Sequence, residues 1–152
     1  MAVYKVVQMG DPVLRETAKP VKAINDSILR LLDNLRDTLH EYDGVGLAAP
    51  QIGISKRVIV VDNGEEYYEL INPEIIKSEG REKAIEGCLS IPHLNGKVKR
   101  ATRVTVKGLN REGEEQYIEA NGLLARAFQH EIDHLDGILF VDRAEWVARK
   151  ET

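Results

Sequence analysis

The amino-acid sequence predicts an α+β fold with antiparallel β-sheet. Two segments, one in each half of the chain, have the apolar periodicity of amphipathic helices. Between them lie short β-branched runs separated by turn sequences, which is the spacing of antiparallel hairpins. Strands and helices do not alternate along the chain, so a parallel α/β fold is not expected.

The first predicted element is a long N-terminal helix over residues 26–42, after an irregular opening segment interrupted by Asp11-Pro12. Apolar residues recur along it at helical spacing: Ile28, Leu31, Leu32, Leu35 and Leu39. Asn25 or Asp26 can cap the N-terminus, and Asp43-Gly44 is typical of a helix end. The leucine stripe therefore indicates packing against the core.

The strands are expected after a glycine-rich loop. Residues 57–62 form a β-branched run, residues 68–72 form a second one, and Asn63-Gly64 is typical of the turn between them. Residues 103–107 and 115–119 alternate between apolar and polar side chains with a period of two, and a turn sequence with a glycine joins them. The sequence therefore predicts two antiparallel pairs.

The second long helix is predicted from Leu123 to Asp136, with Asn121-Gly122 before it and Gly137 at its end. We expect the antiparallel sheets to pack around this helix. It is the central element of the predicted fold because it contains the sequence His-Glu-x-x-His, from His130 to His134.

The spacing of this motif has a direct chemical meaning. Residues four apart lie on one face of a helix, so His130 and His134 can direct two imidazoles at one metal ion. Glu131 lies about 100° further round the helix, where it can reach a water on that metal as a proton acceptor without being a ligand. A catalytic metal site needs a third protein ligand and one open position.

The third ligand is not provided downstream in either of the common ways. Metzincin peptidases have another histidine six residues after the second one, and here that position is Phe140. A second group of peptidases takes a glutamate from a later helix. Here only a short charged tail with Glu145 and Glu151 follows, and neither glutamate is an attractive ligand.

Three upstream residues remain as candidates for the third ligand. His40 is near the end of the first helix among charged residues, and His93 follows a proline in a loop, so both are expected to be solvated. Cys88 is the strongest candidate because it follows Gly87, which permits close backbone approach. A thiolate from a loop and two imidazoles from a helix would leave one position open.

Three sequence motifs, in this order, resemble those of the peptide deformylase family. They are Gly44-Val45-Gly46-Leu47-Ala48-Ala49-Pro50-Gln51, then Glu86-Gly87-Cys88-Leu89-Ser90, then Gln129-His130-Glu131-Ile132-Asp133-His134. The resemblance extends from Gly10 to Phe140, nearly the whole chain. It implies hydrolysis of the N-terminal formyl group of formyl-methionyl nascent polypeptides with release of formate.

The resemblance also implies the metal site and the catalytic residues. Cys88, His130 and His134 would hold one divalent ion per chain, with Fe²⁺ as the usual native ion and Zn²⁺, Ni²⁺ or Co²⁺ as substitutes. Glu131 would be the general acid–base, which agrees with the chemistry expected of its position. The side-chain amide of Gln51 and the backbone N–H of Leu89 would stabilise the oxyanion.

The expected substrate-binding residues come from three segments. By resemblance, backbone groups of the first motif and of the segment around Cys88 pair with the substrate main chain like an added strand. The methionine side chain would enter an apolar pocket lined from the second helix, by Arg126 through its aliphatic stem. The full expected set is Gly44, Val45, Gly46, Glu86, Gly87, Leu123, Arg126 and Ala127.

Two other functions were weighed against this one. A zinc endopeptidase of the His-Glu-x-x-His type lacks its usual third ligand here. A binding module with a structural zinc needs four protein ligands, and it would leave Glu131 without a role. Release of formate rather than peptide fragments separates the enzyme classes.

The composition is consistent with an enzyme that acts in the cytoplasm. Of the 152 residues, 43% are hydrophobic and 30% are charged, which is typical of one globular domain spanning residues 1–152. A net charge of −4 with interspersed signs predicts no direct nucleic-acid site. No apolar stretch predicts a membrane span, and a single cysteine favours a reducing compartment. Some family members dock on the ribosome through a long C-terminal helix, whereas the tail here is short, so any ribosome contact is expected to be transient.

Overall fold

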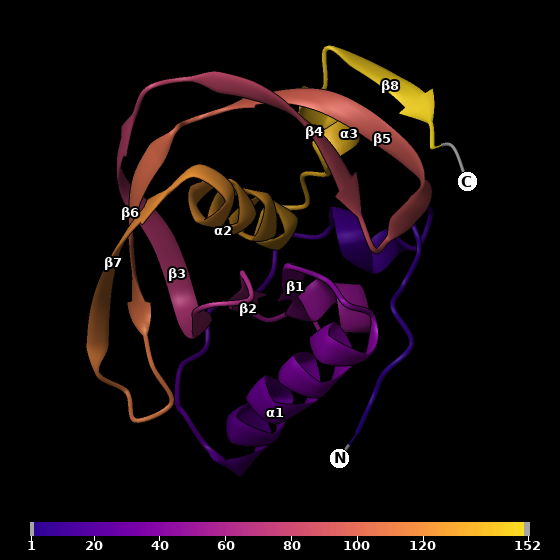
Figure 1. Ribbon diagram of the computed structural model, residues 1–152. Helices are drawn as coiled ribbons and strands as arrows, with labels where there is room; N and C mark the ends of the chain where they lie inside the picture. Colours follow the sequence, from indigo (N-terminus) through magenta and orange to yellow (C-terminus); the bar gives the residue numbers. More distant parts are fainter. Residues whose placement is uncertain (1, 151–152) are drawn as a thin grey trace.

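The computed structural model describes residues 2–150 and has the mixed α and β architecture with antiparallel sheets that the sequence predicts (Figure 1). The larger sheet has the order β1-β2-β3-β6-β7, and the smaller one has the order β4-β5-β8. The strands of the larger sheet are β1 (Gly46–Ala48), β2 (Val58–Asp62), β3 (Tyr67–Glu79), β6 (Arg103–Leu109) and β7 (Glu115–Asn121). Those of the smaller sheet are β4 (Glu82–Cys88), β5 (Ile91–Arg100) and β8 (Trp146–Arg149).

The helices connect and cover these sheets. The two long ones are α1 (Asp26–Glu41) and α2 (Gly122–Leu135), and the short ones are η1 (Pro12–Arg15), η2 (Ala49–Ile52) and α3 (Phe140–Arg143). α2 lies between the two sheets in Figure 1, whereas α1 packs below β1 and β2. None of the helices in residues 2–150 has the length and apolar character needed to cross a membrane.

α1 is held by its cap and its leucine stripe. The Asn25 side chain accepts a hydrogen bond from the Ile28 N–H (3.1 Å), which satisfies one of the free donors at the helix start. The apolar residues of the stripe are buried against η2 and the strands above. Full burial of such a side chain contributes about 1.5–3 kcal/mol, so packing dominates the stability of this helix.

β2 shows how the core is divided. Val58 and Val60 face the cluster that contains α1, while Ile59 and Val61 face the cluster that contains α2. Successive residues of a strand point to opposite faces, and both faces are covered here, so all four side chains are fully buried. The larger sheet is therefore covered by a long helix on each face at this position.

A third cluster joins the smaller sheet to the C-terminal part of the chain. Leu14, Ile91, Val98, Leu139 and Phe140 are buried together, and Cys88 packs against their edge. The Phe140 ring stacks on His130 of α2 with 6.2 Å between the ring centroids. This contact connects the smaller sheet to the helix with the His-Glu-x-x-His sequence.

The element boundaries differ from the predictions in several places. α1 ends at Glu41 rather than at residue 42, and α2 runs one residue earlier at each end than predicted. The predicted strand at 68–72 is the start of β3, which continues to Glu79 through two register shifts. Near the first shift, Asn72 has a φ of 52°, and its side-chain amide both accepts from and donates to the Val21 backbone.

The smaller sheet was not predicted, and the expectation of loops around Cys88 and His93 was wrong. Cys88 is the last residue of β4, and His93 lies in β5. These strands contain glycines, a proline and many charged residues, so they lack the β-branched runs on which a strand prediction depends. The glycine-rich segment after α1 likewise forms β1 and η2 rather than a loop.

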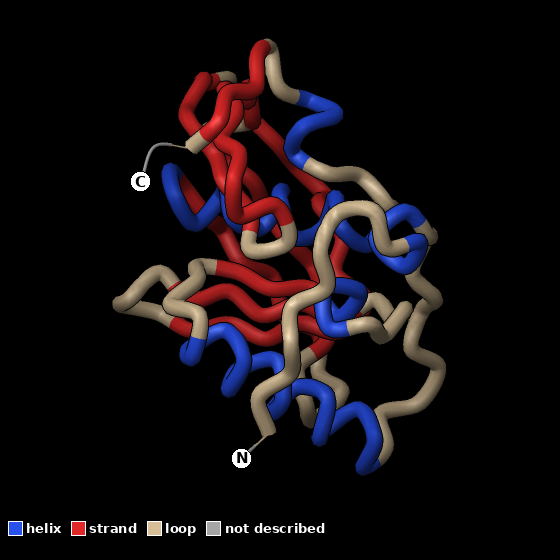
Figure 2. Tube along the Cα trace, turned by 90° about the vertical axis from the view of Figure 1, so that its right-hand side faces the viewer, coloured by secondary structure: helices blue, strands red, loops and turns tan. Residues whose placement is uncertain are grey.

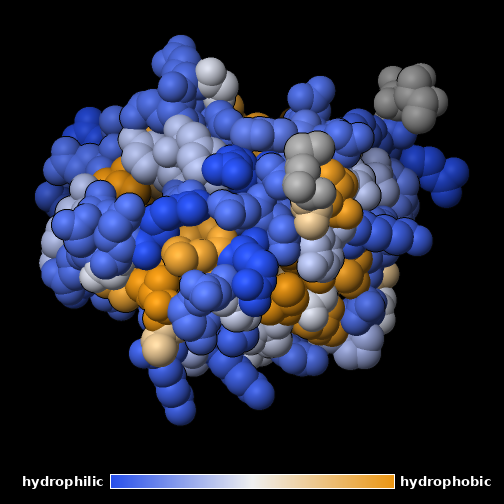
Figure 3. Space-filling model, turned by 90° about the horizontal axis from the view of Figure 1, so that it is seen from below, coloured by the Kyte–Doolittle hydropathy of each residue, from blue (hydrophilic) through white to orange (hydrophobic). Residues whose placement is uncertain are grey.

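The face of the molecule seen from below is mostly hydrophilic (Figure 3). Seen from below in Figure 3, hydrophobic side chains lie in small groups that hydrophilic ones interrupt, as on many monomeric proteins. Figure 2 shows the chain before η1 as an extended loop that rises from beside α1 towards the smaller sheet.

Candidate metal centre and substrate pocket

The three sequence motifs meet at one cavity of about 470 Å³ between the two sheets and α2. The first motif forms the segment after α1 together with β1 and most of η2, the second forms the end of β4 and the following turn, and the third lies on α2. All of the residues predicted for the site line this cavity except His134, which lies beneath it and is 1% exposed. The fold therefore brings the predicted site residues together.

Three potential metal ligands lie at the bottom of the cavity. The Cys88 sulfur and a ring nitrogen each of His130 and His134 are all within 4.8 Å of one another. The Cys88 Sγ and His134 Nε2 are 3.3 Å apart. These are the only three or more acidic, histidine or cysteine side chains that group in this way in residues 2–150. One thiolate and two imidazoles are a donor set that suits a transition metal and leaves a position open.

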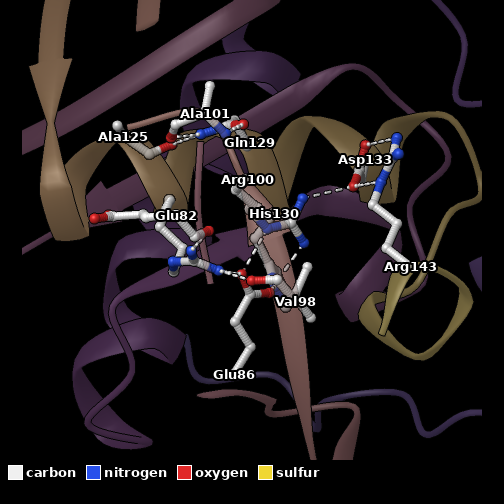
Figure 4. A network of polar contacts seen from close by, with 11 residues as sticks. Glu82, Glu86, Val98, Arg100, Ala101, Ala125, Gln129, His130, Asp133 and Arg143 are labelled. Carbon is white, nitrogen blue, oxygen red and sulfur yellow. Dashed lines mark hydrogen bonds and ion pairs between the residues drawn. The ribbon is translucent and has the colours of Figure 1, made fainter. Parts of the chain in front are cut away.

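The orientation of His130 is fixed by Glu86. The His130 Nδ1 donates to Glu86 Oε1 at 3.0 Å, so Nε2 is left with its lone pair for a metal (Figure 4). Glu86 also accepts two hydrogen bonds from Arg100, at 2.6 and 2.9 Å, and one from Arg126 at 2.5 Å. Burial alone would raise the pKa of Glu86, but the hydrogen bonds from His130 and Arg100 hold it at about 2.

The same network continues along α2 to the surface. Arg100 Nη1 donates to Asp133 Oδ2 at 2.9 Å, and Arg143 of α3 donates to both oxygens of Asp133 at 2.6 and 2.9 Å (Figure 4). Arg100 is 4% exposed, so this guanidinium is a buried charge that is compensated by two carboxylates. The network holds α2, β4, β5 and α3 in one arrangement around the metal ligands.

The Gln129 side chain forms an amide clamp next to the candidate metal ligands on α2. The Gln129 side chain donates to the Ala101 oxygen and accepts from the Ala101 N–H, at 2.9 and 3.0 Å (Figure 4). Gln129 thereby pairs with the backbone after β5 as a neighbouring strand would. This clamp fixes the helix against the connection between the two sheets.

Glu131 lines the cavity, and one oxygen of its carboxylate has no hydrogen-bond partner among residues 2–150. Its Oε1 is buried and unpaired, and burial raises the pKa of this carboxyl to about 7. A carboxyl with such a pKa can both accept and release a proton near neutral pH. Buried groups with shifted pKa values are typical of catalytic sites, so this finding favours a role in proton transfer.

Gly46 makes room for this carboxylate. A Cβ atom added at Gly46 would lie 2.5 Å from Glu131 Oε2 and 2.8 Å from its Cγ. No real side chain fits at that distance, so the absence of a side chain on β1 allows the Glu131 carboxylate to lie against the strand. The need for glycine here comes from contact with Glu131, whereas the sequence motif indicated a turn or a substrate contact.

The Gln51 side chain has a defined direction. Its Oε1 accepts from the Ala48 N–H at 2.9 Å, so its NH₂ group must point the other way. There the Nε2 donates to Ser90 Oγ at 3.2 Å and lies 3.5 Å from Cys88 Sγ. Gln51 is 1% exposed, and its amide donor is therefore held rigidly next to the candidate ligands.

Two predicted pocket residues, Glu86 and Arg126, face the cavity with only part of each residue. The Glu86 side chain does not form a wall of the pocket, because its carboxylate is taken up by His130 and the arginines. Only its backbone remains for a substrate. The Arg126 guanidinium points away and donates to Glu86 and the Val98 oxygen, so its stem is the part that lines the cavity, as expected. Leu123 is 58% exposed at the rim.

Several residues of the site were missed from the sequence. Ser90 contacts the candidate catalytic residue Gln51, and Arg100 contacts both Glu86 and Asp133. Pro92 and Lys150 line the cavity as well. Arg100 stands in a run of basic residues that looks like a solvated strand, and only its burial distinguishes it. His40 pairs with Asp62 at 3.0 Å, away from the cavity, and Glu151 lies outside the described residues.

Comparisons with known proteins identify the family. A sequence model described as polypeptide deformylase matches residues 3–150. The chain is 67% identical to a peptide deformylase from Carboxydothermus hydrogenoformans, over 99% of both chains, and 59% identical to one from Desulfitobacterium hafniense, over 99% of this chain and 100% of the other.

Solved structures give the same result. The peptide deformylase from Thermotoga maritima superposes with a TM-score of 0.92 at 44% identity, covering 96% of this chain and 100% of that one. A peptide deformylase from Synechococcus elongatus, solved in complex with actinonin, gives a TM-score of 0.91 at 44% identity over 94% of this chain and 79% of that one. The chain therefore belongs to the polypeptide deformylase family, metalloenzymes that remove the N-terminal formyl group from nascent peptides.

Proposed function

We propose that this chain removes the formyl group from formyl-methionyl peptides with Glu131 as the general acid–base. The observation that carries this proposal is the unpaired, buried Glu131 carboxyl next to Cys88, His130 and His134. We propose that these three side chains hold one divalent ion, so that α2 is the metal-binding helix of the fold. When bound, the ion would lower the pKa of a water and polarise the formyl oxygen.

The side chains of the protein would perform the remaining steps. Glu131 accepts a proton from the attacking water and then transfers it to the departing amine nitrogen, so that formate and a free N-terminus are produced. Its unpaired oxygen and its pKa of about 7 support both transfers. The pocket walls of Ile91, Leu123 and Ala127 limit competing water around the reacting atoms.

We propose Gln51 and Leu89 as the donors to the oxyanion. Attack on the formyl carbon moves negative charge to its oxygen, which is stabilised best by donors fixed before the reaction. The Gln51 amide is fixed by Ala48 and Ser90, and the Leu89 N–H belongs to the turn after Cys88. Removal of one such donor typically costs about 10²–10³ in kcat.

The two sheets offer a binding site for the substrate backbone. β1 is an edge strand of the larger sheet and β4 is an edge strand of the smaller one, and residues of both line the cavity. We propose that an extended peptide lies between them and pairs with backbone groups of Gly44, Val45, Gly46 and Gly87. Its methionine side chain would then contact Leu123, Ala127 and the Arg126 stem.

The identity of the metal is a proposal too. We propose Fe²⁺ as the native ion, with Zn²⁺, Ni²⁺ or Co²⁺ able to bind the same ligands, because one thiolate and two imidazoles accept all of these ions. Metal analysis of protein purified without oxygen tests this. Finding zinc alone in such a preparation would contradict it.

We further propose that residues 1–152 form one catalytic domain that acts in the cytoplasm and meets the ribosome only transiently. The family match over residues 3–150 and the single cysteine support this reading. Co-sedimentation of the purified protein with ribosomes at two salt concentrations tests the last part. A complex that survives high salt would contradict a transient contact.

The experiment that tests the function measures formate and peptide products together. Metal-loaded protein is incubated with a formyl-Met-Ala-Ser peptide, and we expect equimolar formate and the intact deformylated peptide. Cleavage of internal peptide bonds would instead favour the zinc endopeptidase. A pair of hydroxamate pseudopeptides with a butyl or a methyl side chain tests the pocket, since each lost methylene should weaken binding by about 1–3 kcal/mol. Actinonin, which the Synechococcus relative binds, serves as a further probe.

A further inference from the structure

Three consecutive residues near the N-terminus bond to both segments that carry the proposed oxyanion donors. The Val7 N–H donates to the Gln51 oxygen at 2.7 Å. The Gln8 side chain donates to the Leu89 oxygen at 3.3 Å, and the Met9 N–H donates to the Ser90 oxygen at 2.9 Å. We call Val6–Met9 the N-terminal strap. It bridges the end of the first motif and the turn of the second one.

The strap is anchored on both sides by its side chains. Val6 is 2% exposed and packs in the cluster that contains Leu47, Ala49 and Ile52. Val7 points the other way and packs against the cluster beside Cys88. An extended segment places successive side chains on opposite sides, so the strap is wedged between the two motifs.

This bridge matters because the two donors belong to different sheets. Gln51 lies in η2, which directly follows β1 of the larger sheet, whereas Leu89 lies in the turn between β4 and β5 of the smaller one. No backbone ladder joins these sheets in residues 2–150. Figures 1 and 2 show the N-terminal trace running from beside α1 towards the tip of the β4–β5 hairpin, across the junction of the two parts.

We propose that the N-terminal strap is a positioning element of the catalytic site, with Gln8 as its adjustable side-chain tie. It sets the distance between the Gln51 amide and the Leu89 N–H, and thus the geometry of the oxyanion site. This inference rests on the proposed roles of those two donors. The direct contact between Gln51 and Ser90 ties the segments on the cavity side, and the strap ties them from behind.

Gln8 is suited to test this because its contribution to folding is small. Its side chain is exposed, and its Nε2 bonds only to the Leu89 oxygen and, within the strap, to the Val6 oxygen at 3.2 Å. Replacing Gln8 with methionine keeps the length and removes the donor. Replacing it with lysine keeps a donor on a long stem and should restore the tie.

The experiment compares Gln8→Met, Gln8→Lys and the control Gln116→Met in metal-loaded enzyme. Gln116 is the second residue of β7, and the one hydrogen bond that its side chain makes within residues 2–150 is to the oxygen of the neighbouring Glu115. We expect Gln8→Met to lower kcat about two- to tenfold, the worth of one hydrogen bond. KM, metal content and the thermal midpoint should stay unchanged, and Gln8→Lys and Gln116→Met should keep the wild-type kcat.

A double-mutant cycle separates positioning from general destabilisation. In a Gln51→Met background the spacing of the two donors no longer matters, so Gln8→Met should lower kcat by a smaller factor there than in wild type. Equal losses in the two backgrounds, or an unaltered kcat for Gln8→Met, would overturn the inference. Full activity of Gln51→Met would overturn the proposed role of Gln51 itself, and the inference with it. If kcat falls in Gln51→Met but not in Gln8→Met, the strap inference is wrong while the proposed role of Gln51 stands.

Discussion

At the scale of single residues, the candidate site depends on an unpaired carboxylate oxygen and on a position that has no side chain. Within residues 2–150, one buried carboxylate oxygen of Glu131 has no hydrogen-bond partner, which is costly for folding and therefore indicates a functional role. Gly46 provides the space for this carboxylate by having no side chain. These two residues form one functional pair, although they lie on different elements and are far apart in the sequence.

We predict that Glu131→Gln retains the metal and loses most of its activity. The amide has almost the same shape, but it cannot accept the proton of the attacking water, and such a group typically contributes about 10²–10⁴-fold. Metal content and formate release are measured on the same preparation. Wild-type turnover in the fully loaded variant would rule out the general-base role.

We predict that Gly46→Ala lowers kcat strongly by displacing the Glu131 carboxylate, since the new Cβ would lie 2.5 Å from Oε2. Val45→Ala, a change at the neighbouring exposed position, is the control and should leave the carboxylate in place. In a Glu131→Ala background, Gly46→Ala should lower kcat little further, because the new Cβ then meets no carboxylate. An equal cost in both backgrounds would show that the glycine acts on the backbone instead.

At the scale of elements, the sequence predicted those helices and strands whose own residues carry a clear periodic pattern. The helix with His130 and His134 has an unbroken period, and α1 has a cap and five apolar residues in phase, so both were found. β4 and β5 were missed because they lack β-branched runs and because two of their buried positions hold the charged residues Glu86 and Arg100. A buried Arg100 looks polar in sequence, and only the partners supplied by β4 and α2 make its burial possible.

The same reason explains which site residues could be predicted. His130 and His134 could be proposed as ligands from their spacing on one helix face, and Cys88 from its residue type, the glycine before it and the resemblance to the family motif. Arg100, Asp133 and Gln8 make contacts that only the tertiary structure brings about. No local sequence pattern marks these three residues. Those residues are visible only through their contacts.

We predict that Arg100→Met destabilises the protein far more than Arg143→Met. Loss of Arg100 leaves the buried Glu86 with fewer partners, and breaking a buried pair typically costs about 3–5 kcal/mol. Arg143 is half exposed in its pair with Asp133, so its loss should cost about 0–1 kcal/mol. Urea unfolding of both metal-loaded variants gives the comparison. Similar losses of stability in the two variants would contradict the larger contribution of the buried pair.

At the scale of the whole molecule, α2 is the common contact surface of the two sheets. The larger sheet and α1 form most of the core, and the smaller sheet joins it through the Phe140 cluster, the arginine network and the strap. The cavity lies where these parts meet. A metal held by Cys88 of β4 and the two histidines of α2 would add a further link between them.

We predict that removal of the metal lowers the thermal midpoint of the whole protein. A ligand that binds only the folded state stabilises it by RT ln(1 + [L]/Kd), about 4 kcal/mol when the free ion is about 1,000 times Kd. Calorimetry before and after chelation measures the shift. In Cys88→Ala the shift should shrink, because the link to β4 is lost. A midpoint in wild type that does not respond to chelation would contradict the cross-link.

Cys88 precedes the two histidines by more than forty residues, so these side chains emerge from the ribosome at different times. The thiol leaves the ribosome well before the helix with the two imidazoles, so the growing chain holds no complete set of ligands until α2 has emerged and the β4–β5 hairpin has docked on it. With the proposed ligand set, capture of the ion would be a late step of maturation rather than an early one. The ions present around the freshly folded chain would then decide which metal the enzyme first carries.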